Sequence, residues 1–180
     1  MKKEIRICGF GGQGVILAGF IIGKAASVFM DYHAVQSQSY GPEARGGAAR
    51  SEIIISDEKI GYPRPLSVDC LVAMSQESFD TYRQDIRDDT VIIIDPDLVK
   101  SHNIGKSLYR VHAQQIAEEL GNKIVTNIVM VGAFTGIFGL LKPEAVRESV
   151  IDSVPKRFTD LNVMAFDKGF EAGKNAVNEL

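Results

Sequence analysis

The chain has 180 residues, a length typical of one domain with a substantial core. Hydrophobic residues make up 45% of it and charged residues 24%, as in an ordinary soluble domain. A formal net charge of −3 argues against nucleic acid or an anionic membrane as main partner, because both select a basic surface. We therefore expect a single domain over residues 1–180 that binds neither.

The most informative motif lies near the N-terminus. A predicted strand over residues 4–8 leads into Gly-Phe-Gly-Gly-Gln-Gly at residues 9–14, and an apolar helix pattern over 13–29 follows. Glycines let a backbone turn tightly and approach a ligand, and the start of the helix offers unpaired N–H groups to an anion. The same spacing also suits a tight packing turn. Both hypotheses, phosphate binding and packing, stay open at this point.

The next predicted strand, over residues 33–37, argues against a dinucleotide cofactor. A dinucleotide-binding unit carries an acidic residue at the end of its second strand, where it binds the ribose. Here that strand ends in Ser37 and Gln38, and Asp31 lies before it. A self-sufficient NAD-dependent dehydrogenase is therefore disfavoured.

Further along the chain, strands and helices alternate. Residues 51–56 are predicted to form a strand that returns through Ile60 and Tyr62 as an antiparallel hairpin. Continuous apolar runs, typical of parallel strands covered on both faces, occupy 69–74 and 90–95, and one more short strand is predicted over 108–111. Helices are predicted over 77–83, 113–120, from Pro143, and over 159–177. The pattern predicts a doubly wound, Rossmann-like α/β fold, with a mostly parallel sheet and an antiparallel hairpin insertion.

The stretch 124–141 carries no charge and has about the minimum length of a membrane span. Polar residues and three glycines dilute it. We predict instead a buried helix that starts near Ile128 with Asn127 as its N-cap. Gly132 and Gly136 would let this helix pack closely against the sheet.

Cys8 and Cys70 lie far apart, each within a strand-like run, which indicates core residues of a reduced, cytoplasmic protein. Residues 2–4 lead directly into the first strand, so no secretory signal is expected. Neither cysteine has a second ligand at metal-binding spacing. By itself the chain is predicted to hold neither an iron–sulfur cluster nor a structural zinc.

Ligands of such sheets bind beyond the C-terminal ends of the strands. Three segments are expected there, the glycine loop 9–14, the loop 38–47 and the turn 95–97. Arg45 could reach a phosphate or carboxylate, or it could be an exposed surface residue. Asp95 and Asp97 are predicted as turn and cap residues more than as catalysts.

No catalytic residue is predicted. His33, His102 and His112 are scattered and have no partner at a recognisable spacing. From the residues alone, the chain is predicted to be a component of a larger enzyme. The alternative is a stand-alone nucleotide- or phosphate-binding module.

Two motifs in order carry a family resemblance. They are the glycine loop at 9–14 and Ser-Tyr-Gly-Pro-Glu-Ala-Arg-Gly-Gly at 39–47, followed by Ser-Asp-Glu at 56–58 and Tyr-Pro at 62–63. Together they resemble the gamma subunit of the 2-oxoacid:ferredoxin oxidoreductases, over nearly the whole chain. The second motif is most similar to that of the 2-oxoglutarate type. Subunits for pyruvate, 2-oxoisovalerate and indolepyruvate share much of it, so those substrates stay open.

The resemblance implies an enzyme complex that oxidatively decarboxylates a 2-oxoacid to an acyl-coenzyme A and reduces ferredoxin. The complex would use thiamine diphosphate, Mg and [4Fe–4S] clusters, held by alpha, beta and ferredoxin-like delta subunits. The isolated gamma chain would bind none of these and would be inactive. Because it would then expose apolar docking surface, we expect it to form a homo-oligomer.

The resemblance also implies a role in assembly and in the placement of coenzyme A. By that analogy Gly11, Gly12, Gln13 and Gly14 would accept a coenzyme A phosphate, with Arg45 nearby. The alternative is that the loop 38–47 docks a partner subunit.

Overall fold

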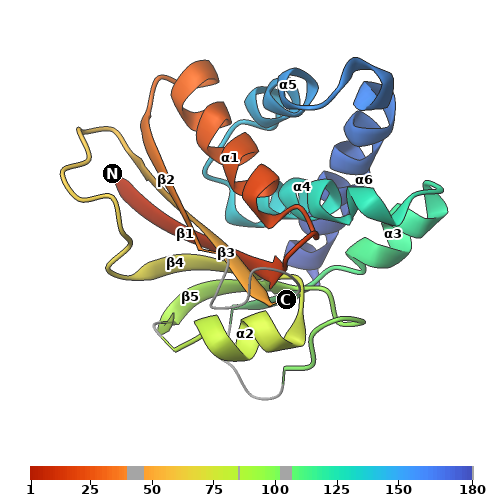
Figure 1. Cartoon of the computed structure of the whole chain (residues 1–180), viewed down its shortest axis with the longest axis horizontal. Helices are drawn as coiled ribbons and strands as arrows, with labels where there is room; N and C mark the ends of the chain where they lie inside the picture. The colour runs from red at the N-terminus through yellow and green to blue at the C-terminus, as the bar shows by residue number, and fades with distance from the viewer. Residues whose placement is uncertain (40–46, 85, 102–106, 180) are drawn as a thin grey trace.

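A computed structural model describes residues 1–39, 47–84, 86–101 and 107–179. Within these residues, six strands form one sheet in the order β2–β3–β1–β4–β5–β6 (Figure 1). The strands are β1 (Lys2–Phe10), β2 (His33–Ser39), β3 (Ala48–Ser56), β4 (Val68–Ala73), β5 (Ile86–Ile94) and β6 (Leu108–Arg110). β1, β4, β5 and β6 are parallel, whereas β3 is antiparallel to both β1 and β2.

Helices cover both faces of the sheet. They are α1 (Val15–Phe29), α2 (Gln76–Tyr82), α3 (Ala113–Glu119), α4 (Thr126–Phe138), α5 (Pro143–Ser153) and α6 (Thr159–Asn178), with short 3-10 turns η1 (Lys123–Val125) and η2 (Lys156–Phe158). α2 lies below the sheet in Figure 1, and α1, α4, α5 and α6 lie above it. The prediction of a doubly wound, mostly parallel α/β fold is confirmed.

The continuous apolar run in β4 follows from this double cover. Cys70 and Val72 face the larger core, which the strands share with α1 and α4. Leu71 and Ala73 point the other way, into a smaller core around Phe79 of α2. Successive side chains of a strand point to opposite faces, so a strand buried on both faces has no polar alternation.

The antiparallel insertion is real, but its predicted hairpin partner is wrong. β3 pairs with β1 on one side and β2 on the other, so it has no free edge for a return strand. The segment through Ile60 and Tyr62 contains no strand. It is held instead by Glu4, whose carboxylate accepts the N–H groups of Leu66 and Ser67 at 2.7 Å each.

The charge-free stretch is a core helix, as predicted, and no described helix is long and apolar enough to cross a membrane. The predicted N-cap is wrong. α4 begins at Thr126 after Val125, and Asn127 lies inside the helix. Its side-chain amide donates a hydrogen bond to the carbonyl oxygen of Gly14 at 3.2 Å. Asn127, which looks like an N-cap in the sequence, therefore links α4 to the glycine loop instead.

The glycines of α4 pack closely, as predicted, but against α6 and not against the sheet. A Cβ on Gly132 would lie 2.2 Å from the carbonyl oxygen of Phe166. In the opposite direction, a Cβ on Gly169 of α6 would lie 2.1 Å from the carbonyl oxygen of Val129. The two helices therefore meet backbone to backbone.

Candidate functional site

The glycine loop joins β1 to α1 at the C-terminal end of the parallel strands. Gln13 braces it, because its carboxamide oxygen accepts the N–H of Phe10 at 2.6 Å and its amide donates to the carbonyl of Met74 at 3.0 Å. Its backbone N–H closes the turn by donating to the carbonyl of Phe10 at 3.1 Å. The side chain of Gln13 thus ties the loop to the end of β4.

Gly12 and Gly14 both have left-handed backbones, with φ of +99° and +74°. This conformation strains residues that carry a Cβ. Their surroundings differ, however. A Cβ on Gly14 would lie 2.3 Å from the side-chain nitrogen of Asn127, whereas a Cβ on Gly12 would meet no atom of the described residues within 4 Å. Gly14 therefore permits the close approach of α4, and Gly12 leaves the backbone open to a ligand.

Gly14 is also the N-cap of α1, and among the described residues no side chain caps this helix start. The N–H groups of the first helical turn have no intrahelical acceptor, and they carry the positive end of the helix dipole.

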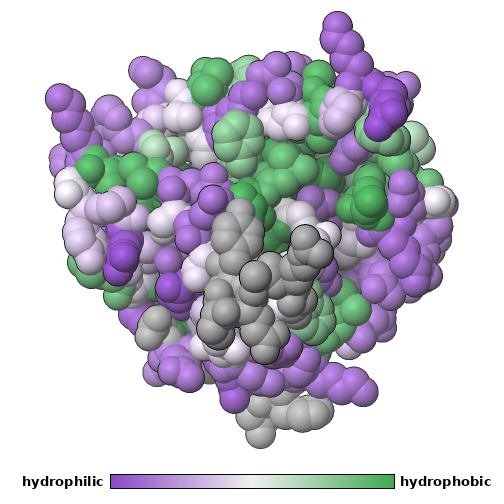
Figure 2. All heavy atoms as spheres, viewed as in Figure 1, coloured by the Kyte–Doolittle hydropathy of each residue, from purple (hydrophilic) through white to green (hydrophobic). Residues whose placement is uncertain are grey.

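Two hollows flank the open Gly12. The first, of about 220 Å³, is lined in part by Gln13, Leu98, Gln114 and Lys123. The second, of about 340 Å³, is more apolar and is lined in part by Leu17, Phe158 and Leu161. Gly12 and Ile124 line both. Figure 2 shows apolar side chains gathered on this face of the molecule.

Lys123 is a cation that the sequence did not point to. It lines the first hollow, and its ammonium pairs with Glu118 at 2.9 Å while its side chain stays 68% exposed. Nothing marks it in the sequence, because a lone lysine before an apolar helix is unremarkable. Arg45, the predicted cation, lies outside the described residues.

The three segments predicted to gather do so in their described parts. The N–H of Gly11 donates to the carbonyl of Gly47, the last residue of the loop 38–47, at 3.1 Å. Leu98, next to the turn 95–97, shares the first hollow with Gly12.

Asp95 has the capping role predicted for it. Its buried carboxylate accepts the N–H groups of Asp97 at 2.9 Å and Gln114 at 2.7 Å, the latter in the first turn of α3. Burial raises the pKa of Asp95, and these hydrogen bonds oppose the rise. Asp97 lies 2.9 Å from Nδ1 of His112, a pair that the sequence did not reveal across fifteen positions.

The carboxylates of Asp95 and Asp97 and the imidazole of His112 offer atoms within 4.8 Å of one another. Such a set has the oxygen and nitrogen donors that a divalent cation accepts. Both oxygens of Asp95 already accept backbone N–H groups, however, so the start of α3 accounts for the arrangement. Of the other histidines, His33 is exposed at the start of β2 and His102 lies outside the described residues.

The strand order strengthens the argument against a dinucleotide. In a dinucleotide-binding unit the second strand lies next to the first, so its terminal acid reaches the ribose. Here β3 separates β2 from β1. One extra strand moves the end of β2 about 5 Å further from the glycine loop.

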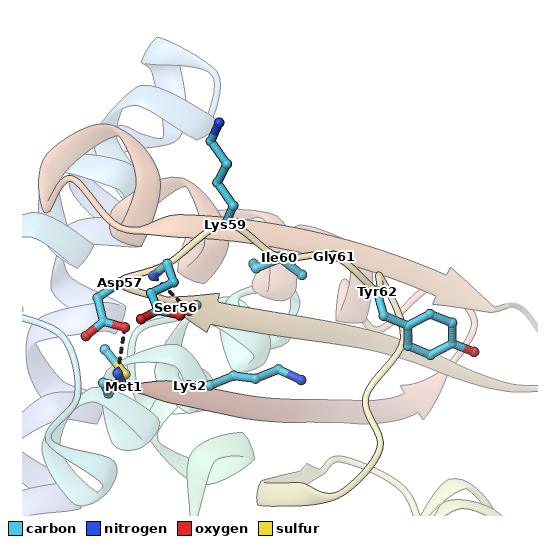
Figure 3. Close-up of a pocket in the computed structure, with 9 residues that line it drawn as sticks. Met1, Lys2, Ser56, Asp57, Lys59, Ile60, Gly61 and Tyr62 are labelled. Carbon is cyan, nitrogen blue, oxygen red and sulfur yellow. Dashed lines mark hydrogen bonds and ion pairs between the residues drawn. The ribbon is translucent and has the colours of Figure 1, made fainter.

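A further hollow, of about 270 Å³, lies at the opposite end of β1 (Figure 3). The N-terminal amine pairs there with Asp57 at 2.5 Å, and Lys59 points away from both. With about 3.3 Å per residue, the length of β1 places this hollow more than 20 Å from the glycine loop. It therefore belongs to a different part of the surface.

The sequence pattern of the pyruvate ferredoxin/flavodoxin oxidoreductase family matches residues 4–172. The chain belongs to this family. The predicted resemblance is thereby confirmed, and the family match extends from β1 into α6.

Two KorC relatives match this chain along nearly their whole length. The 2-oxoglutarate synthase subunit KorC of Methanocaldococcus jannaschii is 47% identical over 178 residues, which cover 97% of this chain and 95% of the relative. KorC of Methanothermobacter marburgensis is 49% identical over 179 residues, covering 95% and 96%. The ketoisovalerate oxidoreductase subunit VorA of Methanothermobacter thermautotrophicus is 32% identical, and the match covers 99% of this chain but 38% of VorA.

Solved structures share the fold. The gamma subunit of a keto/oxoacid ferredoxin oxidoreductase from Geobacter sulfurreducens superposes with a TM-score of 0.89 at 40% identity, covering 98% of both chains. A 2-oxoglutarate:ferredoxin oxidoreductase from Magnetococcus marinus, with 2-oxoglutarate, coenzyme A and succinyl-CoA bound, gives 0.86 at 25% identity. That match covers 97% of this chain and 31% of the other. In this relative the same fold is therefore one part of a longer chain.

Proposed function

We propose that this chain is the gamma subunit of a 2-oxoglutarate:ferredoxin oxidoreductase, active in complex with its alpha, beta and delta subunits. The observation that carries the proposal is the full-length identity of 47% to 49% with KorC subunits of three archaea. Identity falls to 32% for the ketoisovalerate relative, which favours 2-oxoglutarate over that substrate.

The cysteines support placing the iron–sulfur clusters on other subunits. Cys8 faces the smaller core and Cys70 the larger one, so their thiols lie on opposite faces of the sheet. Both are fully buried. A cluster needs several thiolates converging on one point, which these two residues cannot provide.

We further propose that the glycine loop binds a phosphate of coenzyme A. The support is the open space at Gly12, the start of α1, which no described side chain caps, and Lys123, which lines the adjoining hollow with its ammonium paired to Glu118. Coenzyme A would supply the thiol that accepts the acyl group, and this chain would orient its phosphate end. The competing hypothesis is that the same surface docks a partner subunit.

Co-expression of the chain with its partner subunits tests the assignment of substrate. The complex should reduce ferredoxin with 2-oxoglutarate and coenzyme A, and should do so far more slowly with pyruvate or 2-oxoisovalerate. A complex that prefers one of those acids would refute the 2-oxoglutarate assignment. Failure of the chain to join any such complex would favour a stand-alone phosphate-binding module.

Gly12→Ala tests the phosphate hypothesis in that complex. A Cβ at Gly12 would fill the space over the loop, so KM for coenzyme A should rise about tenfold or more while KM for 2-oxoglutarate stays unchanged. Gly139→Ala is the control, because it also adds a Cβ to a positive-φ glycine, with φ +64°, that has no described atom within 4 Å, at the far end of α4. Loss of assembly by Gly12→Ala alone would favour docking. If the Gly12→Ala complex assembles and keeps wild-type KM values, the phosphate hypothesis is refuted and the glycine loop is only a tight turn.

A further inference from the structure

The edge of the sheet next to α1 carries an unusual combination of features. β2 is an outer strand, and β3 is its one strand partner among the described residues. Its sequence, His-Ala-Val-Gln-Ser-Gln-Ser, has no Lys, Arg, Asp, Glu or Pro, and its register with β3 runs without a bulge over seven pairs. Natural edge strands are usually protected by such residues or by a bulge, because exposed edges pair with other chains.

α1 runs beside this edge (Figure 1), and two of its apolar side chains are exposed there. Phe20 is 47% and Val28 63% exposed. A groove of about 360 Å³ runs between helix and strand, lined by these two residues and by Ala34 and Gln36 of β2. Phe20, Lys24 and Val28 follow one another at intervals of four, so they form a stripe about 12 Å long on one face of the helix.

The charge in this stripe is already compensated. The ammonium of Lys24 pairs with Asp152 at 2.6 Å and lies 5.6 Å from the ring centre of Phe20. Its side chain is only 17% exposed. The lysine is thus turned along the protein surface, and it leaves the apolar groups on either side of it available.

We infer that this edge binds a second copy of the same chain, with β2 of the two copies pairing antiparallel about a twofold axis. Two observations favour a second copy over a different protein. A strand without charged residues meets its own copy without like-charge repulsion. The stripe is self-complementary, because an axis near Lys24 brings Phe20 of each copy against Val28 of the other. The groove of one copy then receives an apolar side chain of its mate, and the sheet continues across both.

Sedimentation equilibrium of the full-length chain tests this inference. The wild type should be a dimer, and Val28→Glu should weaken it at least a hundredfold, because the twofold axis repeats the substitution. Gln38→Lys, at an exposed position of β2, should act in the same direction. Met164→Glu is the control, since Met164 is a similarly exposed apolar residue on α6 and lies outside the stripe. Circular dichroism should show all variants folded.

Cross-linking tests the geometry. Chains with Phe20→Cys and chains with Val28→Cys, carrying different tags, should form mixed disulfide dimers faster than either forms with itself. Cys8 and Cys70 are buried and will not compete. A monomeric wild type, or a dimer that Val28→Glu leaves intact, would overturn the inference. A monomer whose Val28→Glu variant no longer joins the alpha and beta subunits would assign the edge to a heteromeric partner. Either result would leave the substrate assignment untouched.

Discussion

Replacement of Gly169 by alanine should destabilise the chain, although alanine favours helices. The new Cβ would lie 2.1 Å from the carbonyl oxygen of Val129, where C···O contacts normally begin at about 3.3 Å. The obstructing atom is backbone, so no rotamer change relieves the overlap, and α4 and α6 must separate by roughly 1 Å. Alanine regains about 1 kcal/mol of helix propensity, whereas overpacking of this kind costs about 3 kcal/mol or more. We expect a net loss of about 2 kcal/mol.

Urea unfolding of the full chain measures this loss. The midpoint for Gly169→Ala should fall with an unchanged m-value, and Tm should drop by about 4–8 °C for a chain of this size. Gly61→Ala is the control, because a Cβ there meets no described atom within 4 Å and the backbone is not left-handed. Its stability should stay within about 0.5 kcal/mol of wild type. If Gly169→Ala is as stable as wild type, the backbone contact between α4 and α6 does not exist in solution.

Two further predictions concern buried polar groups. Glu52→Gln removes the carboxylate that pairs with the buried guanidinium of Arg6 at 2.7 Å, so unfolding free energy measured in urea should fall by about 1–3 kcal/mol. Burial raises the pKa of Cys8 from 9.0 to about 11. As pH rises, the Cys8 thiol ionises first in the unfolded chain. Its contribution to the free energy of unfolding should therefore be complete below about pH 9 and disappear towards pH 11. A thiol reagent should modify Cys8 only when the chain unfolds. Reaction of the folded protein at the rate of a free thiol would contradict that burial.

The sequence predicted the elements better than it predicted their contacts. Strands such as 69–74 were recognisable because burial on both faces leaves an uninterrupted apolar run. The position of β3 in the sheet was not recognisable. The apolar residues in 51–56 indicate that the strand is buried, but they do not indicate which strands pair with it. Similarly, Gly132 and Gly136 indicated close packing but not α6 as the neighbour. Local patterns record burial, whereas pairing depends on the whole chain.

The site shows the same division. The glycine loop was found from its spacing, because tight turns need glycine at fixed positions. Asn127 was assigned to the wrong role, since an asparagine before an apolar run suits a helix cap as well as the long-range bond it makes to Gly14. The fold alone brings Lys123 to the hollow beside Gly12. It also brings His112 next to Asp97, and no sequence spacing indicates either contact.

The glycine loop was open to two explanations, ligand binding and tight packing, and the structure divides them between residues. Gly14 meets the packing requirement, since any side chain there would displace Asn127 and with it the start of α4. Within the described part of the chain, Gly12 has no neighbour that a side chain would disturb. Its left-handed backbone therefore costs conformational freedom without a packing gain. An open, strained glycine beside a helix start that no described side chain caps is understandable if something outside this chain, a phosphate or a partner's backbone, occupies the space above it.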